Sequence, residues 1–125
     1  MDTRQLAAAY LARGDARYGS EPEAELRRLL ADDPDEALVF VEAAIDAART
    51  TNDLGLVGAG ALEDLMKMWG GRFADRLVEK VQEDARWAYA ARIIRGAAGA
   101  EEAIAMIPRV WPDLEAAAQA RLGGR

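Results

Sequence analysis

The sequence of 125 residues contains no cysteine and no histidine. The absence of cysteine excludes disulfides, thiol catalysis and cysteine-ligated metal centres. The absence of histidine removes the commonest general base and the commonest ligand of transition metals. Any catalysis would depend on carboxylates, tyrosines, Lys67 or Lys80, or on a hard metal ion held by oxygen. These absences leave enzymatic activity open but favour a protein that is not an enzyme, and we predict no cofactor.

The sequence also lacks the marks of export and membrane insertion. The stretch that follows Met1 has neither the basic start nor the apolar run of a signal peptide. No segment approaches the ~20 apolar residues that a membrane span needs. Fourteen arginines stand against two lysines, a bias typical of GC-rich genomes. We therefore expect a cytoplasmic bacterial protein that does not bind membranes.

Aromatic residues are scarce, at 6% of the chain, whereas apolar residues make up 51% and much of that share is alanine. Alanine, leucine, arginine and glutamate all favour helix, and no run of alternating β-branched residues predicts a strand. The fold class is therefore all-α, with closely packed helices and few bulky side chains in the core. The length fits one domain, over residues 1–125.

Capping residues and apolar spacing predict eight or nine short helices. Ser20 and Glu23 have the spacing of a capping box, and Asp33 precedes a proline that can open the next helix. This next helix, over about 34–49, carries apolar residues on most of its circumference, which predicts burial on more than one side near the middle of the domain. Short helices fit antiparallel pairs stacked like an α-solenoid better than a four-helix bundle.

Acidic residues give a net charge of −6 and are concentrated near the N-terminus. Residues 21–46 hold nine acids and only two bases, Arg27 and Arg28. Such a surface repels nucleic acid, because binding there depends on neutralising phosphates, but it attracts a basic protein. The alternative is that these acids cap helices and keep the chain in solution.

Small residues and acids meet in the stretch Gly58–Met66, which we interpret as a tight break between two helices. Gly58-Ala59-Gly60 is not a phosphate-binding loop, because no strand precedes it and no Gly-Lys-Ser/Thr follows. Gly58 is better explained as a helix end followed by a close helix–helix contact. The adjacent acids Glu63 and Asp64 either complement the positive end of the second helix or bind a hard cation or a cationic group.

The residues of this stretch resemble those of an uncharacterised bacterial helical domain family, over about residues 53–95. The family pattern is a short Leu- and Ala-rich helix, a small-Gly-Pro-Leu-Glu-Asp-Leu-Leu turn, His-Gly, Phe-x-Asp-Arg and Asp-Pro-Arg-Phe/Trp. The residues that match are Leu54, Leu56, Gly60, Leu62, Glu63, Asp64, Leu65, Met66, Gly70, Phe73, Asp75, Arg76, Asp84, Arg86 and Trp87. Ala61 replaces the usual proline, and Trp69 replaces the usual histidine. The resemblance implies a compact helical domain and no known activity.

Two hypotheses about function follow. The first is a non-enzymatic adaptor that binds another protein, with a basic partner favoured, through the acidic 21–46 face or a groove near Glu63, Asp64 and Arg76. The second is a carboxylate-based enzyme or a site for Mg²⁺ or Ca²⁺ that uses Glu63, Asp64 and Asp75. A homodimer is a third arrangement. The candidate binding residues are Glu63, Asp64, Asp75, Arg76, Arg86 and Trp87, of which Asp75, Arg76 and Arg86 can equally form ion pairs between helices, and Trp87 can equally be a core residue.

Overall fold

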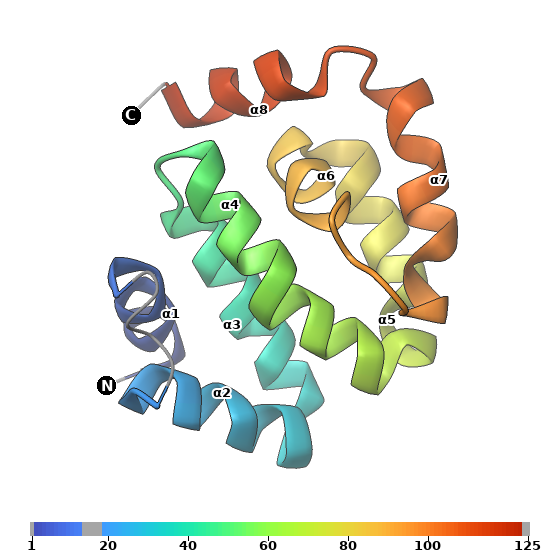
Figure 1. Ribbon diagram of the computed structural model, residues 1–125. Coiled ribbons are helices and arrows are strands. Elements are labelled where there is room, and N and C mark those ends of the chain that lie inside the picture. The colour runs from blue at the N-terminus through green and yellow to red at the C-terminus, as the bar shows by residue number, and fades with distance from the viewer. Residues whose placement is uncertain (1, 14–18, 124–125) are drawn as a thin grey trace.

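The computed structural model describes residues 2–13 and 19–123, and these residues contain helices and no strand. The prediction of an all-α fold is therefore confirmed. In this part of the chain, eight α-helical segments follow one another, some directly and others through short connections (Figure 1). Their bounds are α1 (Thr3–Ala12), α2 (Glu21–Asp32), α3 (Pro34–Ala47), α4 (Thr51–Val57), α5 (Glu63–Glu83), α6 (Ala85–Ala91), α7 (Glu101–Val110) and α8 (Leu114–Gly123), with a π-helical turn η2 (Gly58–Leu62) and a short 3-10 helix η3 (Ala98–Ala100).

Side-chain caps start the first helices where the sequence places them. Ser20 Oγ accepts a hydrogen bond from the backbone N–H of Glu23 at 3.4 Å, and α2 follows. Asp33 accepts from the N–H of Glu36 at 3.3 Å, and Pro34 takes the first position of α3. Each cap satisfies one of the amides that a helix start leaves without a partner. These short-range contacts make the helix starts predictable from sequence.

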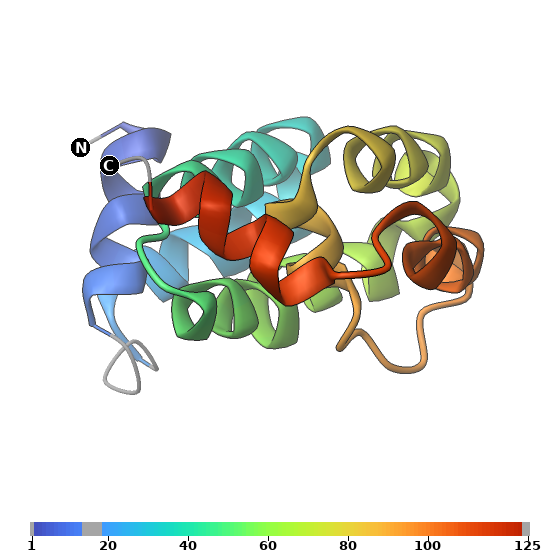
Figure 2. The ribbon, with the colours of Figure 1, turned by 90° about the horizontal axis from the view of Figure 1, so that it is seen from above.

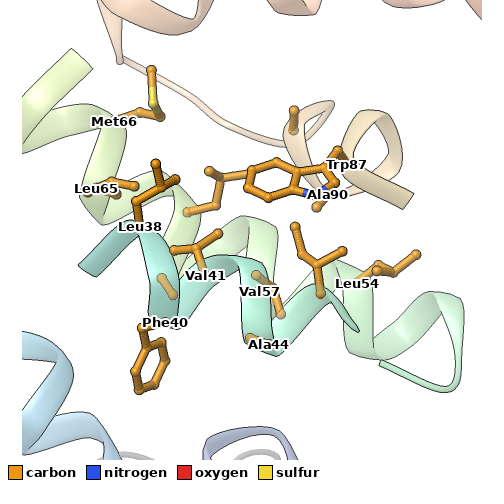
Figure 3. Close-up of a cluster of buried hydrophobic side chains, with 14 of the residues drawn as sticks. Leu38, Phe40, Val41, Ala44, Leu54, Val57, Leu65, Met66, Trp87 and Ala90 are labelled. Atoms are coloured by element: carbon orange, nitrogen blue, oxygen red, sulfur yellow. The ribbon is translucent and has the colours of Figure 1, made fainter. Parts of the chain in front are cut away.

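Helix α3 has side chains in two separate parts of the core, as its pattern predicts. Leu38 and Val41 point toward Trp87, whereas Phe40 points to the opposite side (Figure 3). On that opposite side the ring of Phe40 meets the ring of Tyr10 from α1 edge-on, with centroids 5.4 Å apart. Edge-to-face packing suits the ring quadrupoles. Burial on both sides makes α3 a shared wall between α1–α2 and the rest of the chain.

The predicted break at Gly58–Gly60 is wrong. Gly58 has the ordinary helical angles φ −62° and ψ −45°, and the chain stays helical from α4 through η2 into α5. The direction changes farther on, at Trp69, where φ is −130° and ψ is 26° (Figure 1). Gly58 is present for contact rather than for a turn: a Cβ there would lie 2.1 Å from the carbonyl oxygen of Ala90 in α6.

The expected row of stacked helix pairs is not confirmed either. Over residues 2–13 and 19–123 the continuous helical stretches number seven, not the predicted eight or nine, because α4, η2 and α5 form one stretch and η3 leads directly into α7. Helices α4, α5, α7 and α8 contact the short α6 from several directions, so α6 lies inside the molecule (Figures 1 and 2). Its alanines make this possible, because small side chains allow close approach of helix to helix.

Within the described ranges, no helix combines the length and apolar character that crossing a membrane requires.

Candidate functional site

The six residues predicted to form a binding site lie in three parts of the chain, of which two meet where Arg76 and Trp87 border one small hollow. Glu63 and Asp64 lie in the first turn of α5, before the bend at Trp69. Asp75 and Arg76 are exposed on the part of α5 that follows the bend. Arg86 and Trp87 are buried in α6, with exposed fractions of 5% and 4%. The structure therefore does not bring these residues together into one site.

Glu63 is already engaged by groups of the same chain. Its carboxylate accepts a hydrogen bond from the backbone N–H of Arg95 at 2.9 Å and forms an ion pair with Lys67 at 3.4 Å. Among residues 2–13 and 19–123, no three acidic side chains are grouped so that they could hold a metal ion. Glu63, Asp64 and Asp75 therefore do not form the oxygen cluster that the hard-cation hypothesis requires.

Arg86 is the buried charged residue of the described part of the chain, and it links several helices. Its guanidinium binds Asp84, the N-cap of α6, at 2.8 Å and Asp46 of α3 at 3.3 Å. Arg121 of α8 also reaches Asp84, at 3.5 Å. Burial alone would raise the pKa of Asp84, but the hydrogen bonds and charge of Arg86 outweigh it and lower that pKa. The cluster borders a hollow of about 310 Å³.

We interpret the Arg86 cluster as structural, because its carboxylates already have basic partners. Trp87 has the same role: it is buried, and the ammonium of Lys80 lies 5.7 Å from its ring centroid. Such a contact between a cation and an aromatic face is attractive. For Arg86 the structure fits the alternative of an ion pair between helices, and for Trp87 it fits the alternative of a core aromatic residue.

The acidic 21–46 segment is partly neutralised by bases from distant parts of the chain. Five of its nine acids form ion pairs within the described residues, and these are Glu23 with Arg27, Glu25 with Arg28, Asp35 with Arg72, Glu42 with Lys80, and Asp46 with Arg4 and Arg86. Four of the bases lie outside residues 21–46. The negative charge of this surface is therefore smaller than the local sequence indicates.

Two hollows beside α2 contain the remaining candidate, Asp64. One of about 230 Å³ is lined by Tyr10, Glu23, Leu26, Arg27, Ala59, Gly60 and Asp64. The other, of about 420 Å³, is lined by Arg27, Leu30, Asp64, Lys67 and Met68. Both are bordered by Arg27 and Asp64, so they adjoin at these two residues, and we call the two hollows together the Asp64 groove.

Two facing helix stripes form the walls of the Asp64 groove. One wall comes from α2, where Glu23, Arg27 and Leu30 recur at intervals of four and three. The other follows η2 and α5, where Gly60, Asp64 and Met68 recur at intervals of four. Positions three and four apart lie on one face of a helix. The groove therefore runs along both helices, and the π turn lies in its wall.

Met68 and Asp64 are the distinctive side chains of the Asp64 groove. Met68 is 53% exposed, and it is the one large hydrophobic side chain of the described residues that lies this far in solvent. The carboxylate of Asp64 forms no hydrogen bond or ion pair with a described residue, and partial burial raises its pKa against the opposing charge of Arg27. Perturbed carboxyl groups in hollows are typical of functional sites, and so are π turns within α-helices.

The comparison with family models decides the relationship of this chain to others. The model of a family of unknown function, DUF6869, matches residues 20–117. The chain belongs to this family. No curated protein and no solved structure matches the chain. The resemblance noticed over residues 53–95 is therefore confirmed, and the match extends beyond it in both directions.

The DUF6869 match contains nearly all of the Asp64 groove. It begins at Ser20, the cap of α2, and it includes every groove residue except Tyr10. Helix α1 lies outside the match, and so do the last residues of α8. The Arg86 cluster extends beyond the DUF6869 match through Arg4 and Arg121.

Sequence reasoning finds Asp64 but misses Met68, Arg27 and Leu30. Nothing local marks Met68, because its spacing fits a buried helix face as well as an exposed one. The nearest signal in the sequence is Trp69 followed by two glycines. This pattern predicts that the helix ends just after Met68, but it does not say on which face Met68 lies. The indole of Trp69 donates to the carbonyl of Leu30 at 2.7 Å and ties α5 to α2. This bond holds the two walls together at the end of the groove where Met68 lies.

Proposed function

We propose that the protein is a non-enzymatic interaction module that binds a segment of another protein in the Asp64 groove. The observation that carries the proposal is the exposure of Met68 in a hollow lined by Leu30, Arg27 and Lys67. Leaving a large apolar side chain in water is unfavourable, and burying it fully contributes about 1.5–3 kcal/mol. Methionine is also common at surfaces that bind helices, because its thioether is flexible and polarisable.

The shape of the groove supports a protein segment as the ligand. Two helices with facing stripes make an elongated depression, and a helix of a partner can occupy such a groove with its apolar face inward. The acidic 21–46 face is the alternative contact surface. Since most of its acids have partners in the chain, we place the main contact in the groove rather than on that face.

Substitution of Met68 tests this function. A tagged wild-type protein, Met68→Glu and Ala105→Glu are each used to capture partners from cells of the source organism, and the captured proteins are quantified by mass spectrometry. Ala105 is an exposed helical residue of α7 that does not line the groove, so Ala105→Glu controls for the added charge. A partner recovered with wild type and with Ala105→Glu should fall about 4- to 12-fold with Met68→Glu, because Met68 is already about half buried and its further burial contributes about half of the full energy.

The result against the proposal is equal recovery of every protein with all three baits. Thermal unfolding of each bait is the companion measurement. Both substitutions are at exposed positions, so both baits should unfold within a few degrees of wild type. A Met68→Glu bait that is fully folded and still captures the same proteins would show that the groove is not the contact surface.

A further inference from the structure

The charges around the Asp64 groove leave one carboxylate without a counter-ion. Glu23 pairs with Arg27 at 3.7 Å, and Lys67 pairs with Glu63 at 3.4 Å. These two pairs account for both bases of the groove. Asp64 forms no ion pair with any residue in the described ranges. When Glu63 is counted with the lining residues, because it holds Lys67, three carboxylates stand against two bases and the surplus charge is negative.

The position of Asp64 gives a ligand group access to this charge. Its side chain borders both hollows, and Gly60, one turn earlier, has no side chain to cover it. The neighbouring Leu26 and Leu30 are buried, with exposed fractions of 3% and 4%, and they supply an apolar floor. Lysine and arginine side chains have apolar stems that pack on such a floor while the charged end reaches a carboxylate.

We propose that the bound segment inserts a lysine or arginine side chain against Asp64 and an apolar side chain against Met68. This inference rests on the proposed function, because it specifies which protein segment the groove accepts. Asp64 and Met68 are four residues apart, so they are separated along the helix by about 6 Å. A partner helix therefore presents its basic and apolar residues three or four positions apart.

Two physical arguments favour the cation over an anion. An anion would have to displace Glu23 or Glu63 from its base, whereas a cation meets a carboxylate that Arg27 and Lys67 attract only from a distance, without an ion pair. Partial burial also raises the pKa of Asp64, so its charged form loses some hydration in the free protein, although the side chain stays exposed enough for a ligand to reach it. A guanidinium or ammonium group against it would reverse that penalty, and the planar fork of arginine fits a carboxylate with two hydrogen bonds.

The probe for the test is butylguanidinium, which carries the end of an arginine side chain without a peptide, and its neutral counterpart is butylurea. Each is titrated into the full-length protein, and the backbone amide signals of Ala59, Gly60 and Lys67 are followed by NMR. The variants are Asp64→Asn and the control Asp75→Asn, which removes an exposed carboxylate of the same helix outside the groove.

The expected result is a saturating shift of these signals with butylguanidinium in wild type and in Asp75→Asn. The dissociation constant should rise at least about fivefold in Asp64→Asn, and butylurea should produce no saturating shift. The carboxyl carbon of Asp64 should titrate at a lower pH when the probe is bound. Equal affinity for Asp64→Asn and wild type would overturn the inference, and so would equal shifts with butylurea.

The two proposals fail in different ways. If Met68→Glu abolishes capture of a protein but Asp64→Asn leaves butylguanidinium affinity unchanged, the groove binds protein and the basic anchor is wrong. If Asp64→Asn weakens the probe but no captured protein depends on Met68, Asp64 binds cations and the interaction module is wrong. Asp64→Asn changes an exposed side chain and should fold as well as wild type, so misfolding does not confuse either outcome.

Discussion

The contact between η2 and α6 predicts that two identical substitutions, three residues apart, have opposite effects. Gly55 and Gly58 both lie in the helical stretch that starts at Thr51. A Cβ added at Gly55 meets nothing within 4 Å, whereas a Cβ added at Gly58 lies 2.1 Å from the carbonyl oxygen and 2.8 Å from the carbonyl carbon of Ala90. Gly55→Ala should therefore stabilise the protein, and Gly58→Ala should destabilise it.

The magnitudes follow from two general effects. Replacing glycine by alanine inside a helix gains about 0.5–1 kcal/mol, because glycine loses more backbone entropy on folding. At Gly58 the new methyl group meets backbone atoms that cannot rotate away, so α6 must shift by about 1 Å, and overpacking of this kind costs about 1–3 kcal/mol or more. We expect Gly55→Ala to gain about 0.5–1 kcal/mol and Gly58→Ala to lose about 2 kcal/mol.

Thermal and urea unfolding, followed by far-UV circular dichroism, measure both variants. At about 4 °C per kcal/mol for a chain of this size, the melting temperature should rise by about 2–4 °C for Gly55→Ala and fall by about 8 °C for Gly58→Ala. An unchanged urea m-value would show that the compactness of both end states is preserved. A Gly58→Ala protein as stable as Gly55→Ala would refute the close approach of η2 to α6.

Three further predictions concern side chains that join helices. Arg86→Met removes a buried counter-ion and should lower the free energy of unfolding by about 3 kcal/mol. Arg72→Met breaks an exposed ion pair and should change that free energy by less than about 1 kcal/mol. Urea unfolding of both variants measures the difference. Trp69→Phe loses the hydrogen bond to the carbonyl of Leu30 and should cost about 1–2 kcal/mol, and equal stability would count against that bond. The pKa of Asp84 is lowered in the folded state, so the stability that Asp84 contributes is fully present above the ordinary pKa of an aspartate and is lost as pH falls through the lowered value. Asp84→Asn should therefore lower the free energy of unfolding near pH 7. In an acid unfolding series, its difference from wild type should be smaller below about pH 4.

The parts of the fold that sequence predicts are those set by neighbours in the chain. The caps at Ser20 and Asp33 act over three residues, and the buried faces of α3 follow from a local period. The break predicted at Gly58–Gly60 is wrong because glycine serves either to end a helix or to allow close contact between helices. A glycine past a helix end usually adopts positive φ, but within the described residues only Gly19 and Gly96 do so. Gly58 instead meets the distant Ala90, which no local pattern reveals.

In the site, too, the sequence reveals the acidic residues but not their partners on other helices. Asp64 stood out because paired acids are visible in the sequence. The partners of the other acids were not visible, since Asp35 meets Arg72 and Glu42 meets Lys80 across separate helices. A run of acids therefore overstated the charge of the surface. Finding that Asp64 has no ion-pair partner among the described acids and bases of the groove required the folded arrangement of both walls.

The π turn connects the core contact to the groove, because its residues face both ways. Gly58 and Ala61 are buried, with Gly58 against α6, whereas Ala59 is exposed and lines the groove with Gly60. A π turn holds one residue more than an α turn, so the residues after it are rotated by about 100° relative to an uninterrupted helix. This rotation sets the face on which Asp64 and Met68 stand. A shift of α6 at Gly58 should therefore also move the groove wall, so Gly58→Ala should weaken butylguanidinium binding while Gly55→Ala leaves it unchanged.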